Sequence, residues 1–181
     1  MNSRLSFALI AALSAFPCHA FELDSRDIRA GQVMPKAQEY QGFGCDGGNT
    51  SPQLRWRDVP AGSKSFAVTV YDPDASTGSG WWHWVIFNIP ADVRELPTGA
   101  GDPTGEFAPA GSVQSRTDYG SYGFGGACPP VGDEAHRYQF KVYALDVERL
   151  DLAPDSSAAL VGFMLNAHKL AVAELQALYR R

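Results

Sequence analysis

The sequence has little positive charge. It contains 15 Lys and Arg residues against 20 Asp and Glu residues, which gives a formal net charge of −5. Proteins dedicated to nucleic-acid binding usually carry a basic excess, so this balance excludes that class. Charged residues make up only 19% of the 181 residues and hydrophobic residues 45%, which rules out wholesale disorder and suits one folded domain.

Familiar catalytic signatures are also missing. The chain has no Walker phosphate loop, no G-x-G-x-x-G, no H-E-x-x-H and no G-x-S-x-G. No activated nucleophile is visible either. We therefore predict no catalytic residue, no cofactor and no metal, and a binding protein rather than an enzyme.

Long hydrophobic runs are scarce, and the one at the N-terminus is short. Arg4 precedes a mostly apolar segment over residues 5–16, and Pro17 interrupts its end. A membrane anchor needs roughly 20 apolar residues, so stable membrane insertion is not expected. Small residues at 18 and 20 suit a cleavage site after Ala20. We predict a signal peptide over 1–20, a single domain over 21–181, and export to the periplasm, with release from the cell left open.

Cysteine is rare, with three in the chain. Cys18 would leave with the signal peptide, and Cys45 and Cys128 would remain. An even pair in an exported protein predicts a disulfide, and the alternative is two free buried thiols. The bridge would close a loop of about 84 residues and contribute about 4 kcal/mol in the chain-entropy model.

Gly and Pro, at 18 and 12 residues, separate short strand patterns. Alternation at Leu54 and Trp56 predicts a half-buried strand. Stronger strands are predicted over 65–71, 81–89 and 136–145, while residues 97–128 form a long Gly- and Pro-rich excursion. The chain is therefore predicted to be mainly β and antiparallel.

The C-terminal part has a different period. Apolar residues recur at three- and four-residue steps from Leu160 to Leu178, which predicts an amphipathic helix over that whole segment. Asp155 or Ser156 would cap its N-terminus, and Arg180 and Arg181 would lie at its C-terminus.

Polar side chains lie at the ends of the predicted strands. Asp72 follows one strand, His83 lies within the next, and His136 and Tyr138 share a face of a third. If these strands are neighbours, the four side chains meet and form a small anion pocket, in which the carboxylate fixes one histidine tautomer. The alternative is two unrelated core histidines. The Gly-rich segment 120–126 is either a backbone cradle for phosphate or a flexible turn.

Three longer motifs resemble a known family. They are Tyr-Asp-Pro-Asp-Ala at 71–75, Trp-Trp-His-Trp-Val-Ile-Phe-Asn-Ile-Pro at 81–90, and Gly-Gly-Ala-Cys-Pro-Pro at 125–130 followed by His-Arg-Tyr at 136–138. Together they resemble the phosphatidylethanolamine-binding protein family, and most closely its bacterial Raf-kinase-inhibitor-like branch. The resemblance covers nearly all of residues 21–181.

The resemblance implies an antiparallel β-sandwich with short peripheral helices and a pocket for phosphate or phospholipid head groups. Asp72, His83, His136 and Tyr138 would line the pocket, with Pro129 and Pro130 at its rim, while Asp74 and Arg137 would support it. Cys128 departs from the mammalian pattern and places the predicted disulfide against the pocket. The resemblance also allows a homodimer and a protein partner, but kinase inhibition is not carried over to an exported protein.

Three functions compete. The first is a binding protein that holds a small anion or phosphorylated ligand and modulates protein partners. The second is a metal-assisted hydrolase using Asp72, His83 and His136. The third is a secreted interaction protein whose pocket is incidental and whose partner surface lies on residues 97–128. We favour the first.

Overall fold

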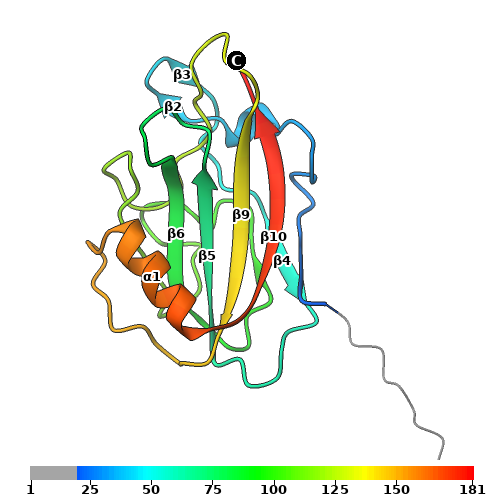
Figure 1. Ribbon diagram of the computed structural model, residues 1–181, viewed down its shortest axis with the longest axis vertical. Coiled ribbons are helices and arrows are strands. Elements are labelled where there is room, and N and C mark those ends of the chain that lie inside the picture. The colour runs from blue at the N-terminus through cyan, green and yellow to red at the C-terminus, as the bar shows by residue number, and fades with distance from the viewer. Residues whose placement is uncertain (1–19) are drawn as a thin grey trace, which may run out of the picture.

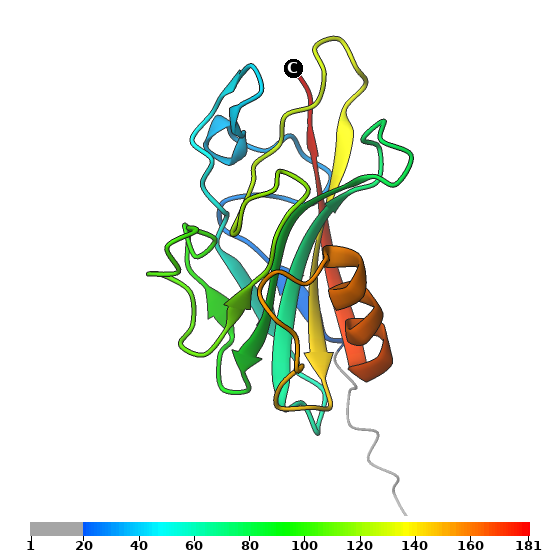
Figure 2. The ribbon, with the colours of Figure 1, turned by 90° about the vertical axis from the view of Figure 1, so that its left-hand side faces the viewer.

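Two facing β-sheets form the body of the protein, seen in a computed structural model that describes residues 20–181 (Figures 1 and 2). The predicted signal peptide lies outside the described residues except for Ala20. The larger sheet has five strands in the order β10-β9-β5-β6-β8 and the smaller one has three in the order β1-β4-β7. All strand pairs within the sheets are antiparallel. The predicted fold class is confirmed.

The bounds of the elements are as follows. The larger sheet contains β5 (Ser65–Asp72), β6 (Trp81–Pro90), β8 (Val113–Gln114), β9 (His136–Leu145) and β10 (Lys169–Tyr179). The smaller sheet contains β1 (Glu22–Asp24), β4 (Leu54–Arg57) and β7 (Glu95–Leu96). A two-stranded hairpin, β2 (Gln41–Gly42) and β3 (Cys45–Asp46), follows a 3₁₀ turn at Lys36–Gln38, and the helix α1 spans Ala158–His168.

The larger sheet is buried on both faces. One face packs on the smaller sheet through residues such as Trp56, Phe66 and Phe140. The other face is covered by α1, whose Val161 and Leu165 are fully buried (Figure 2). This explains why β5 and β6 have nearly continuous apolar sequences rather than alternating ones.

The strand predicted from Leu54 and Trp56 is confirmed as β4. The strands predicted over 65–71, 81–89 and 136–145 are confirmed to within one residue at each end. The C-terminal helix is present but ends at His168, so the prediction that it continues to Leu178 is wrong. Residues 169–179 instead form β10, which pairs with β9 along its length. Ser157 caps α1, in place of the predicted Asp155 or Ser156.

Among residues 20–181, we find no helix with the length and apolar character needed to cross a bilayer.

The antiparallel pairing brings the last residue of β5 and the first residues of β6 and β9 to the same end of the larger sheet. Asp72 at the end of β5 lies opposite Trp81 at the start of β6. β9, which begins at His136, pairs with β5 on its other side. The β2–β3 hairpin and the C-terminus lie at the same end of the molecule (Figure 1).

Candidate functional site

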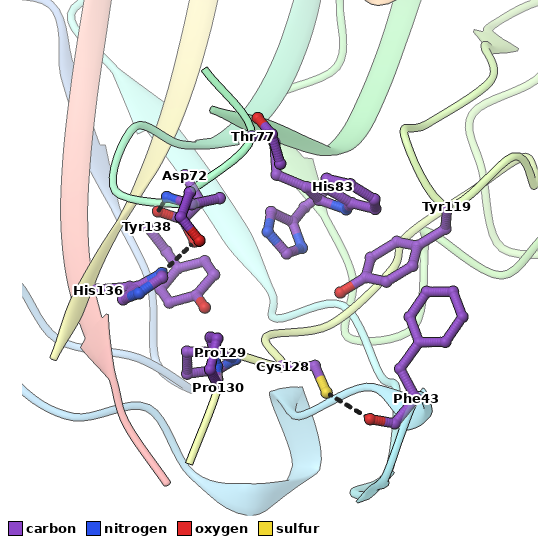
Figure 3. Close-up of a pocket in the computed structure, with 13 residues that line it drawn as sticks. Phe43, Asp72, Thr77, His83, Tyr119, Cys128, Pro129, Pro130, His136 and Tyr138 are labelled. Atoms are coloured by element: carbon purple, nitrogen blue, oxygen red, sulfur yellow. Dashed lines mark hydrogen bonds and ion pairs between the residues drawn. The ribbon is translucent and has the colours of Figure 1, made fainter. Parts of the chain in front are cut away.

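A pocket of about 180 Å³ opens at this end of the larger sheet (Figure 3). The sheet supplies Asp72, Trp81, His83, His136 and Tyr138, so the four predicted lining residues do meet in one place. Loops supply the other walls: Phe43, Ala75, Ser76, Thr77, Tyr119, Cys128, Pro129 and Pro130. The alternative of two unrelated core histidines is therefore wrong.

Asp72 fixes the orientation of His136. The Nδ1 atom of His136 lies 2.7 Å from Asp72 Oδ2, and both side chains are buried. The other carboxylate oxygen, Oδ1, accepts hydrogen bonds from the backbone N–H groups of Asp74 (2.8 Å) and Ala75 (3.2 Å). A carboxylate held in this way accepts the Nδ1 proton of His136. The other ring nitrogen, Nε2, lies 3.6 Å from Asp133 Oδ2.

His83 is held by two backbone carbonyl groups. Its Nδ1 lies 2.8 Å from the oxygen of Gly125 and 3.1 Å from that of Gly126. Carbonyl oxygens only accept, so the hydrogen-bond network assigns the proton to Nδ1. Burial lowers the pKa of His83, with Asp72 opposing the shift, so the ring is neutral at pH 7. Its buried Nε2 has no hydrogen-bond partner among residues 20–181.

Three aromatic residues complete the inner wall. Tyr119 and Tyr138 each meet the ring of His83 edge-on, at centroid distances of 5.6 and 5.1 Å. The Tyr119 hydroxyl donates to the carbonyl of Gly126 at 2.9 Å. Burial raises the pKa of both tyrosines, so both phenols remain protonated. The indole N–H of Trp81 is buried, and it has no hydrogen-bond partner in the described part of the chain.

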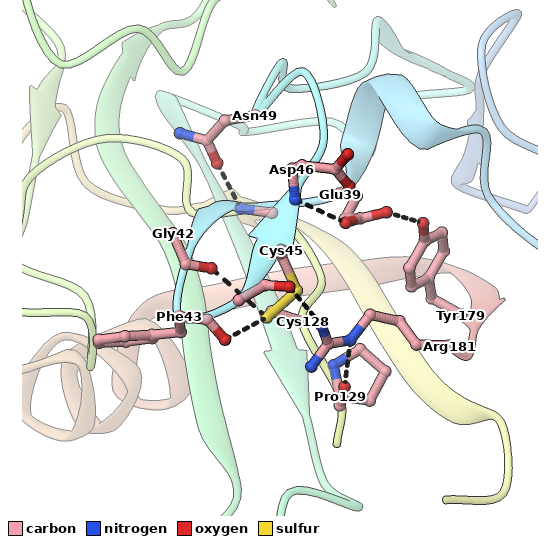
Figure 4. The surroundings of a disulfide bond; sticks show 12 residues. Glu39, Gly42, Phe43, Cys45, Asp46, Asn49, Cys128, Pro129, Tyr179 and Arg181 are labelled. Carbon is pink, nitrogen blue, oxygen red and sulfur yellow. Dashed lines mark hydrogen bonds between the residues drawn. A yellow bond between two sulfur atoms is a disulfide. The ribbon is translucent and has the colours of Figure 1, made fainter. Parts of the chain in front are cut away.

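The rim is tied together by covalent and polar contacts (Figure 4). Cys45 and Cys128 form the predicted disulfide, which links the β2–β3 hairpin to the segment entering Pro129 and Pro130. Arg181 donates to the carbonyl groups of Pro129 and Gly44, both at 2.7 Å. Arg181 therefore supports the pocket rim, and the prediction that it lies at a helix C-terminus is wrong.

Asp74 and Arg137 form an ion pair beside the pocket. Asp74 accepts from the Arg137 backbone N–H at 2.8 Å and from its guanidinium at 2.6 Å. This pairing lowers the pKa of Asp74. The pair joins the turn after β5 to the start of β9, which is the supporting position expected of these residues.

Sequence reasoning missed Phe43, Trp81 and Tyr119 as lining residues. Trp81 shares a face of β6 with His83, so alternation along the strand could have assigned it to the pocket. Phe43 and Tyr119 lie outside regular strands in Gly-rich segments, where no period assigns a direction to a side chain.

The hypothesis that backbone N–H groups of residues 120–126 bind phosphate is wrong for four of these groups, because they already donate to acceptors within the fold. The N–H groups of Gly120, Phe124 and Gly125 donate to backbone carbonyls, and that of Gly126 donates to Asn49 Oδ1. None of residues 120–126 lines the pocket. This segment instead supplies carbonyl acceptors to His83 and Tyr119.

The described part of the chain offers no set of side chains that could hold a metal ion. Within residues 20–181, no three His, Cys, Asp or Glu side chains are grouped so that they could hold a metal ion. The Nδ1 atoms of His83 and His136 are both engaged in hydrogen bonds.

The fold and site define a class: an antiparallel β-sandwich protein with a small pocket of acid, imidazole and phenol groups at one end of its larger sheet. The family model for phosphatidylethanolamine-binding protein matches residues 24–180. The chain belongs to the phosphatidylethanolamine-binding protein family, which confirms the resemblance found in the sequence.

Its bacterial relatives are similar over most of their length. YbcL of Escherichia coli is 54% identical over 179 residues, which cover 99% of this chain and 96% of YbcL. YbhB of the same organism is 54% identical over 159 residues, covering 87% of this chain and 99% of YbhB. The crystal structure of E. coli YbcL, described as a new member of the mammalian PEBP family, superposes with a TM-score of 0.88 at 56% identity and covers 89% of this chain and 98% of that one.

Proposed function

We propose that the protein binds a small phosphate-like anion in this pocket and acts as a binding protein rather than an enzyme. The observation that carries the proposal is Trp81, which lines the pocket and whose buried indole N–H has no acceptor among residues 20–181. A buried donor without a partner is costly, and an oxygen-rich ligand removes that cost. The imidazole of His136 and the phenol of Tyr138 add polar groups to the same pocket.

The bonds made by the sulfur and hydroxyl groups of the pocket support ligand binding rather than catalysis. Cys128 is in a disulfide and offers no thiolate. The hydroxyl groups of Thr77 and Tyr119 donate to backbone carbonyls rather than to a histidine base. Activated nucleophiles need a base within hydrogen-bond reach, and these groups lack one.

Export forms part of the proposal. The N-terminal sequence pattern and the disulfide between Cys45 and Cys128 support it, because disulfides persist in oxidising compartments. N-terminal sequencing of the protein recovered from a periplasmic fraction is expected to begin at Phe21. Recovery from the cytoplasm with residues 1–20 retained would contradict export.

Thermal unfolding with inorganic phosphate tests the binding function. Phosphate at 100 times its dissociation constant stabilises a folded protein by about 2.7 kcal/mol, which raises Tm by roughly 5–10 °C for a domain of this size. His136→Ala should abolish the shift while the unliganded protein stays folded by circular dichroism.

His168→Ala is the matched control. His168 also pairs with a carboxylate through Nδ1, 3.0 Å from Asp146 Oδ1, but it lies outside the pocket. The His168 variant should keep the full phosphate shift. An equal response of wild type and His136→Ala would show that phosphate binds elsewhere.

A further inference from the structure

His83 offers the pocket a hydrogen-bond acceptor. Its only ring proton is used at Nδ1 for the carbonyls of Gly125 and Gly126, so Nε2 carries a lone pair. Nε2 is buried and finds no partner in the part of the chain that the structure describes, and the whole side chain is 3% exposed. A ligand that only accepts hydrogen bonds satisfies Trp81 and leaves His83 unsatisfied.

The charge of the lining residues also favours a ligand that carries a proton. None of its thirteen lining residues is Lys or Arg, and Asp72 contributes a carboxylate. Arg137, the cation nearest in sequence to the lining residues of β9, is engaged by Asp74 outside the pocket. Arg181 at the rim is engaged by the carbonyl groups of Pro129 and Gly44. A dianion would therefore enter a pocket whose lining supplies no Lys or Arg as a countercharge, which is unfavourable.

We infer that the pocket selects a phosphate group that carries a proton, a phosphomonoester monoanion or dihydrogen phosphate, over a phosphodiester, because the P–OH group donates to His83 Nε2. The inference rests on the proposed function and narrows its ligand class. The unprotonated oxygens of the same group accept from Trp81 and the neighbouring donors. A phosphodiester carries the same single charge but has no P–OH, so it leaves the buried acceptor of His83 unpaired.

Two small esters test the selection. Methyl phosphate and dimethyl phosphate are both monoanions when the former holds its last proton, and near pH 6 about half of a phosphomonoester does so. Calorimetric titration at pH 6 should give methyl phosphate an affinity at least about tenfold higher, the cost expected for one unmet buried acceptor. Equal affinities, or tighter binding of the diester, would overturn the selection while leaving the anion site intact.

His83→Asn provides the matched variant. Its amide nitrogen can replace Nδ1 as the donor to Gly125, and the variant has no acceptor at the position of Nε2. The preference for the monoester should disappear. His168→Asn makes the same exchange outside the pocket, so it should keep the preference. A preference that survives in a folded His83→Asn protein would overturn the role of His83.

The failures of the two proposals are distinguishable. If neither ester nor inorganic phosphate binds, the anion pocket itself is wrong and the selection falls with it. If both esters bind with equal affinity, only the selection is wrong. Nitrogen-15 NMR of the histidine rings gives an independent readout, because the Nδ1–H tautomer leaves Nε2 unprotonated in the free protein; a proton on Nε2 would contradict the inference.

Discussion

At the scale of single residues, Asn49 holds the loop whose carbonyl groups bind His83. Its Oδ1 accepts from the Gly126 N–H at 2.8 Å, and its Nδ2 donates to the Phe124 carbonyl at 3.3 Å. Space beside this loop is limited, because a Cβ atom on Gly125 would lie 2.3 Å from the Tyr119 ring. The carbonyl groups of Gly125 and Gly126 set the tautomer of His83, and Asn49, which belongs to a different loop, holds those carbonyl groups in place.

The buried neutral state of His83 predicts how stability depends on pH. Burial lowers the pKa of His83 in the folded protein below its ordinary value of 6.5. The unfolded chain then binds more protons below about pH 6.5, so this residue reduces stability as the pH falls through 6.5 towards the folded pKa. Urea unfolding should show an additional loss of up to about 1 kcal/mol between pH 6.5 and 5.5 in the wild type, relative to His83→Asn. Parallel pH profiles for the two proteins would contradict this assignment.

Residues on strong strands could be predicted from the sequence, and residues on loops could not. Asp72, His83, His136 and Tyr138 were assigned to one pocket because they lie on or next to strands with a clear period. Tyr119 escaped prediction because its direction depends on how a long loop folds back over β6. The hydrogen-bond partners of His83 also belong to that loop, so the tautomer of His83 could not be predicted from the sequence.

At the scale of elements, β10 shows how tertiary pairing overrides local preference. Its sequence is rich in Ala and Leu, which favour helix, and its apolar residues also fit a helical period. The same segment alternates at Ala173, Leu175, Ala177 and Tyr179, all of which are buried against the sandwich core. Pairing with β9 decides between the two patterns, and only the fold provides that neighbour.

The position of the β2–β3 hairpin predicts that it contributes to the binding of ligands larger than phosphate. Phe43 lies at its tip with 72% of its surface exposed, lines the pocket, and lies 5.7 Å from the Tyr119 ring. Phe43→Ala should weaken binding of phenyl phosphate by roughly threefold to tenfold, the range expected for the loss of one aromatic contact. Calorimetric titration provides the measurement.

Inorganic phosphate is the control ligand for this variant. It has no aromatic group to contact Phe43, so its affinity should be unchanged by Phe43→Ala. Loss of affinity for both ligands would show that the hairpin holds the pocket in shape rather than contacting the ligand's organic group.

At the scale of the whole molecule, the pocket joins segments that are distant in the chain. The disulfide connects Cys45 and Cys128 across a sequence separation of 83, and Arg181 joins the same rim from the C-terminus. The pairing of the cysteines could be predicted because only two remain after the proposed cleavage. The contact with the C-terminus could not, because it follows from β10 being a strand that runs back to the pocket.

The disulfide predicts that stability and ligand binding respond together to reductant. Breaking a long-range bridge typically costs about 2–4 kcal/mol, because the unfolded chain regains conformational freedom. Adding a reductant should therefore lower the Tm of the wild type, and it should also weaken phosphate binding, because Cys128 lines the pocket and Cys45 anchors the hairpin that carries Phe43. The double variant Cys45→Ser/Cys128→Ser should start from the lower Tm and show no further change with reductant. A wild-type protein whose Tm and phosphate affinity both stay constant after complete reduction, verified by a thiol count, would show that the hydrogen bonds of Arg181 alone hold the rim.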